Sequence, residues 1–437
     1  MKIDASLHAV LEKLSGEDWE EVEVYHKRGR SRTVRFAPQG TVTTFSQEEG
    51  WAVRAGDRRR SFFYAAAGEP RSDVAWPEAD GRGVRLASAK PVPPWTPPSD
   101  LDVPLIGESE TRGLFEALAR QLAEELPGAR LILGELADGS SESQLVSSRE
   151  VEASVRQRTA LLYLEAAGPG RGSRSIALRL AERDARRFNP RTLGRRLADL
   201  LTVTEKGTTP VRDRGEFVLA PAVVVSLLSA LSDLWLGPGA EEKTAHLTDR
   251  RGKIASPAFT LIDDGRLSGG VLEAPVDGEG QPTREQVLVE EGIFRQPLLA
   301  WWQSTSDPSR VSGCCRRPGW RDLPRPGATH LYLRPETTAS VASLIENLSR
   351  GYYLIATEGA PQVAVADNRF ALPVCGFAIE GGRPTGSITG AWLVGSVSGL
   401  LNGIVTTARD LSFLPVSSGM VGSPSLLIKG LELRQRP

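Results

Sequence analysis

The stretch from Lys253 to Arg295 constrains the fold more than any other part of the chain, because it combines strand-forming runs with glycine-rich turns. A run from Ala258 to Ile262 ends at Asp263-Asp264-Gly265, which is typical of a strand that enters a tight turn. A second strand is expected from Glu285 to Val289. Between them, Asp277-Gly278-Glu279-Gly280 places two carboxylates beside glycines, which adopt positive φ values readily. The pattern predicts two strands joined through an acidic loop.

Several motifs in this half of the chain resemble the TldD/PmbA (TldE) family of bacterial and archaeal proteins, often labelled modulators of DNA gyrase. They are Leu261–Gly265, the Asp277–Gly280 loop with the following Pro282, Thr283 and Arg284, the run VLVEEGIF, and the terminal run GSPSLLIKGLEL. Their order and spacing agree with the family over roughly the last half of the chain. The resemblance is weaker before residue 210.

The helix in front of this stretch indicates which branch of the family the chain resembles. Zinc-bearing relatives carry His-Glu-x-x-x-His there, with two imidazole ligands and a carboxylate that serves as general base. This chain has Ser226, Leu227 and Leu231 at the matching positions. Leucine has no lone pair, and a serine hydroxyl is a poor zinc ligand. The resemblance therefore implies the TldE-like branch, which lacks the zinc motif.

A second departure from the zinc-bearing pattern lies near the carboxy terminus. Zinc-bearing relatives are expected to use a cysteine there as a ligand, whereas Pro415 to Gly422 contains Ser417 and Ser418 and no cysteine. Both halves of the zinc site thus depart from the pattern together. The resemblance implies that this chain supplies no catalytic, cofactor-binding or metal-binding residue, and that zinc is held by a TldD-like partner alone.

The resemblance implies a non-catalytic subunit of a TldD-TldE-type metallopeptidase complex that processes or degrades peptides, including unfolded and leader peptides. The expected partner is a zinc-bearing TldD-like subunit, or a second copy in a homodimer. A stand-alone homodimeric binding or scaffold protein without protease activity is the alternative. A third hypothesis, a hydrolase that uses Ser226, Ser229 and Asp233, ranks last because a serine needs an activating base and none stands at helical spacing. These three residues are the candidate chamber-lining residues.

Charge argues against a dedicated nucleic-acid binder. Lysine and arginine number 53 against 54 aspartates and glutamates, and such a binder would depend on phosphate neutralisation. Two basic clusters still invite that interpretation. We interpret them as a solvated hairpin tip and the outer face of a helix; they are Arg58 to Arg60, and Arg183, Arg186, Arg187, Arg191, Arg195 and Arg196.

The three cysteines and the amino terminus predict a reduced, cytoplasmic setting. Cys314, Cys315 and Cys375 form no disulfide or zinc pattern. The first residues have no apolar core of signal-peptide length. The acidic residues Asp263, Asp264, Asp277 and Glu279 could hold a hard cation, but the loop lacks the ligand order of a calcium motif. We interpret them as structural turn residues.

The segment from Phe217 to Leu236 has membrane-spanning length with one charge, Asp233. Ser226, Ser229 and Asp233 recur at helical spacing, which predicts a buried helix with one polar stripe and no membrane contact. The protein is therefore expected to be soluble and free of both membrane and nucleic acid.

The fold class expected is α+β, in three domains. A helix-plus-antiparallel-sheet domain spans residues 1–98, a second spans 99–210, and a glycine-rich, mainly β domain of TldD/PmbA type, wrapped around the buried helix, spans 211–437. The proline-rich segment 91–104 marks the first boundary. Helices are expected at 4–14, from a cap near Ser109 or Thr111, and at 190–201. Short strands are expected at 21–26, 32–36, 41–45, 50–54, 131–136, 144–148, 160–165, 175–180 and 425–433.

Overall fold

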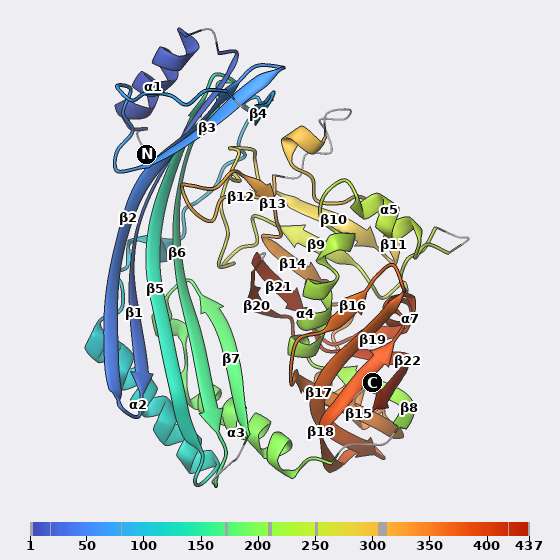
Figure 1. Ribbon diagram of the computed structural model, residues 1–437. Helices are drawn as coiled ribbons and strands as arrows, with labels where there is room; N and C mark the ends of the chain where they lie inside the picture. The colour runs from blue at the N-terminus through green and yellow to red at the C-terminus, as the bar shows by residue number, and fades with distance from the viewer. Residues whose placement is uncertain are drawn as a thin grey trace.

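The computed structural model describes residues 3–17, 19–79, 81–170, 174–208, 212–249, 252–304, 313–417 and 419–435. A long, curved sheet from the first half of the chain, coloured blue to green in Figure 1, runs along one side of the carboxy-terminal half, coloured yellow to red. Helices and strands are both abundant, which confirms the predicted α+β class. The candidate site described below lies where these two halves face each other.

The long sheet has seven strands in the order β4-β3-β2-β1-β5-β6-β7, and every pair in it is antiparallel. Four of its strands have 16 to 18 residues, well beyond the usual ~3–10. The strands are β1 (Glu21–Ala37), β2 (Gly40–Gly56), β3 (Arg60–Ala67), β4 (Gly81–Arg82), β5 (Arg130–Ser147), β6 (Glu152–Ala167) and β7 (Ser175–Glu182). Strands of this length form a curved wall for the cavity beside them.

The short strands expected in the first half are parts of these long strands. The runs 21–26 and 32–36 both lie in β1, and 41–45 and 50–54 both lie in β2. The central parts of the long strands are rich in glycine, serine and charged residues, so no alternation of apolar and polar side chains marks them in the sequence. Pairing of β1 with β5 places strands on both sides of the 91–104 linker in one sheet.

Three helices pack on this sheet close to where they were predicted. They are α1 (Ala5–Ser15), α2 (Glu108–Glu125) and α3 (Pro190–Lys206). The Asp4 carboxylate accepts a hydrogen bond from the Ser6 N–H, which caps α1. Side chains of α1 bury against Val22 and Val24 of β1. Because neighbouring side chains of a strand point to opposite faces, Tyr25 and Lys27 face away from α1, toward the cavity.

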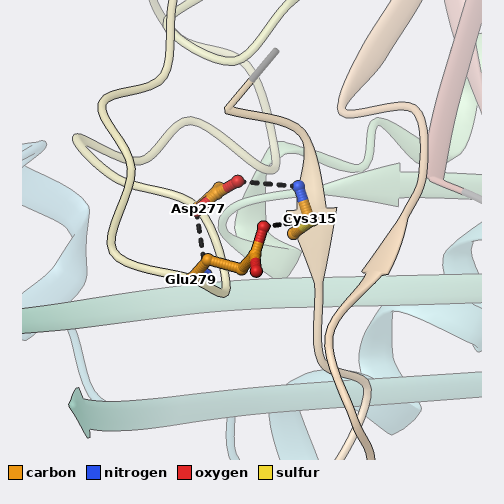
Figure 2. A group of neighbouring side chains, drawn as sticks. All are labelled: Asp277, Glu279 and Cys315. Carbon is orange, nitrogen blue, oxygen red and sulfur yellow. Dashed lines mark hydrogen bonds between the residues drawn. The ribbon is translucent and has the colours of Figure 1, made fainter. Parts of the chain in front are cut away.

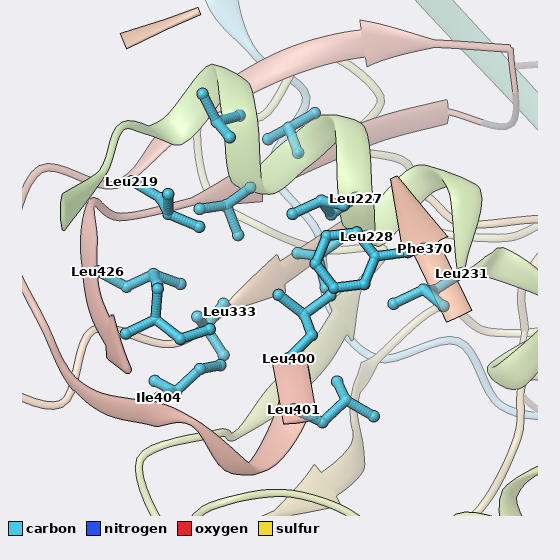
Figure 3. Packing of buried hydrophobic residues seen from close by; sticks show 14 of the residues in the cluster. Leu219, Leu227, Leu228, Leu231, Leu333, Phe370, Leu400, Leu401, Ile404 and Leu426 are labelled. Atoms are coloured by element: carbon cyan, nitrogen blue, oxygen red, sulfur yellow. The ribbon is translucent and has the colours of Figure 1, made fainter. Parts of the chain in front are cut away.

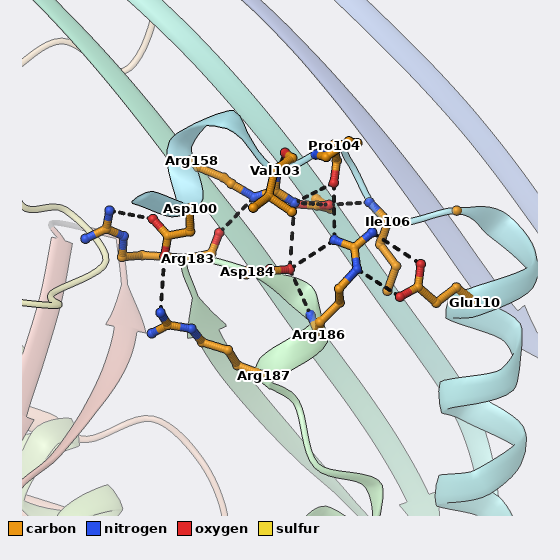
Figure 4. Close-up of polar contacts among 12 residues, drawn as sticks. Asp100, Val103, Pro104, Ile106, Glu110, Arg158, Arg183, Asp184, Arg186 and Arg187 are labelled. Atoms are coloured by element: carbon orange, nitrogen blue, oxygen red, sulfur yellow. Dashed lines mark hydrogen bonds and ion pairs between the residues drawn. The ribbon is translucent and has the colours of Figure 1, made fainter. Parts of the chain in front are cut away.

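Arginines and carboxylates fasten the linker to the long sheet (Figure 4). Arg158 and Asp138, both fully enclosed, pair at 2.9 Å, and Arg158 also donates to the carbonyl of Pro104 at 3.1 Å. Arg183 is 5% exposed and pairs with Asp100 at 2.6 Å and with Glu273 at 3.3 Å. The expectation that Arg183 lies on a solvated helix face is wrong, because these carboxylates hold it inside.

Most of the other basic residues lie at the surface, as expected, but Arg196 is half-buried and burial lowers its pKa. Arg58, Arg59 and Arg60 form an exposed tip between β2 and β3, where Asp57 accepts the N–H of Arg59 and Arg60. Arg186 pairs with Glu110, Arg187 with Asp100 and Arg195 with Glu125. Interspersed carboxylates therefore neutralise much of this cluster.

The carboxy-terminal half holds a six-stranded sheet and a closed ring of strands. The sheet has the order β11-β10-β9-β14-β21-β20. The ring closes because β15 pairs with both β8 and β17, while β22 and β18 complete it. The bounds are β8 (Arg212–Leu219), β9 (Leu261–Asp264), β10 (Glu285–Glu290), β11 (Ile293–Phe294), β14 (His330–Leu333), β15 (Arg350–Thr357), β16 (Gln362–Ala364), β17 (Arg369–Glu380), β18 (Arg383–Gly395), β19 (Ile404–Thr407), β20 (Ser412–Val416), β21 (Gly419–Ser423) and β22 (Leu426–Arg434).

The remaining elements are short. They are α5 (Ala240–Ala245), α6 (Val341–Glu346), α7 (Val397–Asn402), and the hairpin of β12 (Cys315–Arg316) with β13 (Arg325–Pro326). Single 3-10 turns lie at Ser99–Asp102, Ala185–Arg187, Ser232–Leu234 and Trp301–Gln303. The β12–β13 hairpin matters most here, because it carries residues of the candidate site.

The strand predicted at 258–262 begins three residues later than expected. Phe259 N–H donates to the Ser256 carbonyl in a turn, and β9 starts at Leu261. Asp263 and Asp264 continue the strand, because they pair with Gln286 and Glu285 of β10. The predicted strands at 285–289 and 425–433 are confirmed within one residue at their ends as β10 and β22.

The buried helix expected between 217 and 236 is α4 (Pro221–Ala230), followed by the 3-10 turn at Ser232–Leu234. Phe217 belongs to β8, so the apolar segment is divided among a strand and two short helices. Figure 3 shows Leu227 and Leu228 of α4, with Leu231, packed beside Phe370 and Leu400. Within the described residues, no helix is both long and apolar enough to cross a membrane.

Candidate functional site

The positions that match the zinc motif lie on or beside α4 and offer no set of metal ligands. Leu227 and Leu231 are 2% and 1% exposed and belong to the largest apolar core. Ser226 is half-buried on the same helix. A zinc ion needs lone pairs from nitrogen, sulfur or oxygen, and two of the three positions are hydrocarbon. These residues therefore do not fit zinc.

The three candidate chamber-lining residues do not converge on one point. Ser229 Oγ donates to the Val225 carbonyl of its own helix at 2.7 Å. Asp233 is exposed and pairs with Lys243 at 3.0 Å. None of Ser226, Ser229 and Asp233 lines the cavity described next. Their role in a peptide chamber stays a prediction.

A cavity of about 710 Å³ lies between the long sheet and the carboxy-terminal half. On the sheet side β1, β5 and β6 line it, and several of the side chains from β1 and β5 are small. They are Gly29, Ser31, Gly139, Ser141 and Ser143. On the other side lie residues between 271 and 278, residues 315–318, and residues 415–417, 419 and 420. Small side chains leave space for a ligand to approach the sheet backbone.

The predicted acidic loop closes one end of this cavity. The Asp277 Oδ1 accepts the N–H of Glu279 at 2.8 Å and of Gln281 at 2.9 Å, and its Oδ2 accepts the N–H of Cys315 at 2.9 Å. Gly280 has φ +72°, and a Cβ there would lie 2.3 Å from Val151. The sequence places glycine at this position because both the φ value and the contact exclude a side chain. The contacts of Asp277 are those of a structural turn residue.

Glu279 and Cys315 lie beside Asp277 (Figure 2). Glu279 Oε2 accepts hydrogen bonds from Cys315 Sγ at 3.1 Å and from the Trp301 N–H at 3.2 Å. Glu279 Oε1 is buried and has no hydrogen-bond partner, although Arg54 lies 3.9 Å away. One ligand atom from each of Asp277, Glu279 and Cys315 lies within 4.8 Å of the others, the only such group among the described residues.

The electrostatics of Asp277, Glu279 and Cys315 favour a hydrogen-bonded cluster over a cation site. Burial, with repulsion from Glu279, raises the pKa of Asp277, and burial raises the pKa of Glu279. Burial also raises the pKa of the Cys315 thiol well above its ordinary value, so the thiol keeps its proton. A cation would compete with the backbone N–H groups on Asp277 and would lie near Arg54. We interpret the cluster as structural.

A buried network of charges joins the acidic loop to the long sheet. Glu23 of β1 accepts from Arg54 at 3.0 Å and also from Arg317. Arg317 Nε donates to the Gly278 carbonyl at 2.8 Å. Both arginines favour the ionised form of Glu23, and the pKa of Glu23 is lowered although burial opposes this. The sheet and the loop are thereby held at a fixed distance.

Two further buried residues, Asp263 and His330, hold backbone groups beside the cavity. Asp263 Oδ1 accepts the Thr329 N–H at 2.8 Å, and burial raises the pKa of Asp263 to about 7. His330 Nδ1 lies 2.8 Å from the Asp264 carbonyl, and Nε2 accepts the Leu272 N–H at 3.1 Å. Burial lowers the pKa of His330 to about 4. Both imidazole nitrogens are occupied, so His330 is a structural residue.

Sequence patterns mark the acidic loop but not the residues that surround it. Glu23, Arg54 and Arg317 are scattered over almost 300 positions, and no local pattern connects them. In the sequence, the run Cys314 to Arg317 stands out only for its cysteines. Two adjacent arginines after two cysteines in a short hairpin were the one signal available.

Of the two serines that stand in place of the carboxy-terminal cysteine, Ser417 is exposed at the cavity rim, and Ser418 lies outside the described residues.

Comparison with known proteins identifies related chains. The model of the PmbA/TldA metallopeptidase C-terminal domain matches residues 213–435. The metalloprotease TldD homolog of Buchnera aphidicola subsp. Schizaphis graminum is 26% identical over 171 residues, 39% of this chain and 35% of that protein. The metalloprotease TldD homolog of Haemophilus influenzae is 27% identical over the same shares. The match thus spans about a third of the length of these curated relatives.

A solved structure extends the similarity to the whole fold. TldE from Thermococcus kodakarensis superposes with a TM-score of 0.85, over 98% of this chain and 100% of that one, at 18% sequence identity. At this identity the likeness concerns the fold alone. It includes the long sheet of the first half, which the family model does not cover.

Proposed function

This chain belongs to the PmbA/TldD metallopeptidase family, and from that membership we propose that it is a non-catalytic, TldE-like subunit of a TldD-TldE-type metallopeptidase complex that processes or degrades peptides. The observation that carries the proposal is the environment of α4. Where zinc-bearing relatives have the general base and a histidine ligand, Leu227 and Leu231 pack in an apolar core. The catalytic zinc would belong to a TldD-like partner.

The surroundings of the cavity support a role in holding peptides. Among the described residues, β7 and β20 are the end strands of their sheets, and Ala181 of β7 and Pro415 and Val416 of β20 line the cavity. The end of a sheet offers backbone N–H and carbonyl groups to an extended peptide with little demand on its side chains. In the proposed complex this chain supplies such edges and walls.

The cysteines are compatible with a cytoplasmic setting for the complex, which is part of the proposal. Cys314, Cys315 and Cys375 are all free and buried. Disulfides form in oxidising compartments, and the free state of these three thiols agrees with a reducing one.

Native mass spectrometry of the protein isolated from its own host, with zinc counted on the same sample, tests the proposal. We expect a complex with a His-Glu-x-x-x-His subunit and zinc in proportion to that subunit only. Peptidase activity of the partner is expected to fall when this chain is omitted. A zinc-free homodimer with no such subunit would favour the stand-alone scaffold, and unchanged partner activity would overturn the proposed role.

A further inference from the structure

Two cations that line the cavity form no ion pair with a carboxylate of the part of the chain that the structure describes. Lys27 of β1 and Arg316 of β12 both line it, and neither forms an ion pair with a described carboxylate. Lys27 Nζ donates only to the Pro318 carbonyl at 2.7 Å, and Arg316 Nη1 approaches the Ala328 carbonyl at 3.5 Å. Arg317, next in sequence, differs because Glu23 neutralises it. A partly enclosed cation without a counter-charge is unfavourable unless an anion joins it.

The acidic residues nearest to these cations are engaged elsewhere. Asp277 accepts three backbone N–H groups. Asp263 attracts Arg316 but accepts the Thr329 N–H, and burial disfavours its ionised form. Glu48 and Asp322 both attract Lys27, but Glu48 at the rim is exposed to solvent and Asp322 accepts the Gly319 N–H at 2.8 Å. The interior of the cavity therefore carries an excess of positive charge.

Burial acts on both cations in the same direction. It lowers the pKa of Lys27 and of Arg316, and repulsion from Arg316 lowers that of Lys27 further. The geometry agrees, because both side chains line one cavity and Lys27 Nζ reaches the carbonyl of Pro318, two residues after Arg316. An anion in the cavity beside them would relieve this repulsion.

We propose that this cavity is a carboxylate-binding subsite for peptides, in which Lys27 and Arg316 bind the carboxylate. A guanidinium and an ammonium are the side chains that bind carboxylates by charge-assisted hydrogen bonds. The volume of about 710 Å³ falls within the ~300–1,000 Å³ of small-ligand sites, so it admits the end or a short stretch of a peptide and no folded partner. The assignment of the ligand as a peptide rests on the proposed function.

Serines and glycines of the sheet wall agree with this ligand. Ser141 offers a hydroxyl donor, while Gly29 and Gly139 carry no side chain over the backbone. An acidic peptide end would thus meet Arg316 on β12, Lys27 on β1 and a hydroxyl group on β5. The carboxylate has two sources, the free carboxy terminus of a peptide or the side chain of an aspartate or glutamate.

The test is fluorescence anisotropy on the purified chain without a partner. Three labelled peptides share one neutral sequence: one ends in a free carboxylate, one in an amide, and one in an amide with a glutamate inside the sequence. We expect the free carboxylate to bind about tenfold or more tightly than the plain amide, because a charge-assisted hydrogen bond is lost with the amide. Tight binding of the glutamate peptide as well would assign the site to acidic side chains too.

Variants separate the site from general electrostatics. Lys27→Met and Arg316→Met should each abolish the preference for the acidic peptides. Arg35→Met removes the same charge from β1 outside the cavity, where Arg35 pairs with Glu135, and should leave the preference intact. Since Arg316 forms no ion pair with any described residue, Arg316→Met should melt no lower than the wild type. If this variant fails to fold, the binding measurement on Lys27→Met tests the inference.

Two outcomes would overturn the inference. Equal affinity for the acid and amide peptides would show that no carboxylate is recognised. Tighter binding of a short single-stranded oligonucleotide than of any peptide would assign the cavity to a phosphate backbone instead. The measurement uses this chain alone, so it can succeed even if no zinc-bearing partner exists, which separates its failure from failure of the proposed function.

Discussion

Arg317 hydrogen-bonds Glu23 across the boundary between the carboxy-terminal half and the long sheet. The two residues are 294 positions apart in the sequence, and their side chains are only 2% and 4% exposed. Arg54 of β2 donates to the same carboxylate at 3.0 Å. This contact fixes the acidic loop against the sheet, and with it one end of the cavity.

Removal of Arg317 should therefore destabilise the protein strongly. In Arg317→Met, Glu23 keeps only Arg54, and the remaining buried charge is poorly compensated. We expect a loss of about 3–5 kcal/mol in the free energy of unfolding, measured by urea denaturation. The double variant with Glu23→Gln should recover part of the loss, because the uncompensated carboxylate is gone.

A surface pair is the control for this prediction. Arg28 pairs with Glu142 on the same sheet, but its side chain is 61% exposed. Arg28→Met should change the free energy of unfolding by no more than about 1 kcal/mol. Equal losses in Arg28→Met and Arg317→Met would contradict the importance given to burial.

Asp263 should make the stability depend on pH. Its pKa is about 7 in the folded protein against an ordinary value of 3.8, so between these values the folded state holds a proton that the unfolded chain has released. The stabilisation is complete below about pH 4 and is lost as the pH rises through about 7. Asp263→Asn cannot ionise and keeps an oxygen for the Thr329 N–H. Its free energy of unfolding should rise relative to the wild type from pH 5 to pH 8.

The comparison with the wild type is essential, because His330 acts in the opposite sense. Its pKa of about 4 in the folded protein, below the ordinary 6.5, removes stability as the pH falls. His330 is present in both proteins, so its contribution cancels in the difference. A difference that stays constant from pH 5 to pH 8 would show that Asp263 is ionised throughout.

Leu231 should matter for folding, and the serines of α4 should not. Leu231→Ala removes a side chain that is 1% exposed in the largest core and should lower the free energy of unfolding by about 2–5 kcal/mol. Ser226→Ala and Ser229→Ala should stay within about 0.5 kcal/mol, since both are partly exposed and Ser229 bonds only its own helix. Loss of any detected hydrolysis in a serine variant that folds normally would revive the hydrolase hypothesis.

Local sequence patterns predicted the helices and the elements around the acidic loop because neighbouring residues determine them. Helical spacing of Leu7, Val10 and Leu14 marks α1, and glycines mark the turn at 277–280. Local patterns could not predict that strands from residues 1–98 and 99–210 join in one sheet. This arrangement depends on pairing of β1 with β5, which joins Glu23 to Ser147 across the proline-rich linker.

The candidate site was only half predictable for a related reason. Asp277 and Glu279 stand out because they alternate with glycines, which is a local signal. Arg316 and Lys27 have no such signal, since nothing in the sequence says that the hairpin of β12 approaches β1. An unpaired charge becomes visible only when the surrounding carboxylates can be located in space.

Gly280 is the position at which the acidic loop should be most sensitive to a single methyl group. Its φ of +72° disfavours an L side chain by about 1–2 kcal/mol, and a Cβ would lie 2.3 Å from Val151, in the turn that joins β5 to β6 of the long sheet. Gly280→Ala should therefore lower the melting temperature and push the loop away from the sheet. Gly269→Ala is the matched control, because Gly269 has φ +76° but nothing within 4 Å of its Cβ position. If the two variants melt together, close packing of the loop on the sheet does not contribute, and the loop position that defines the cavity would need revision.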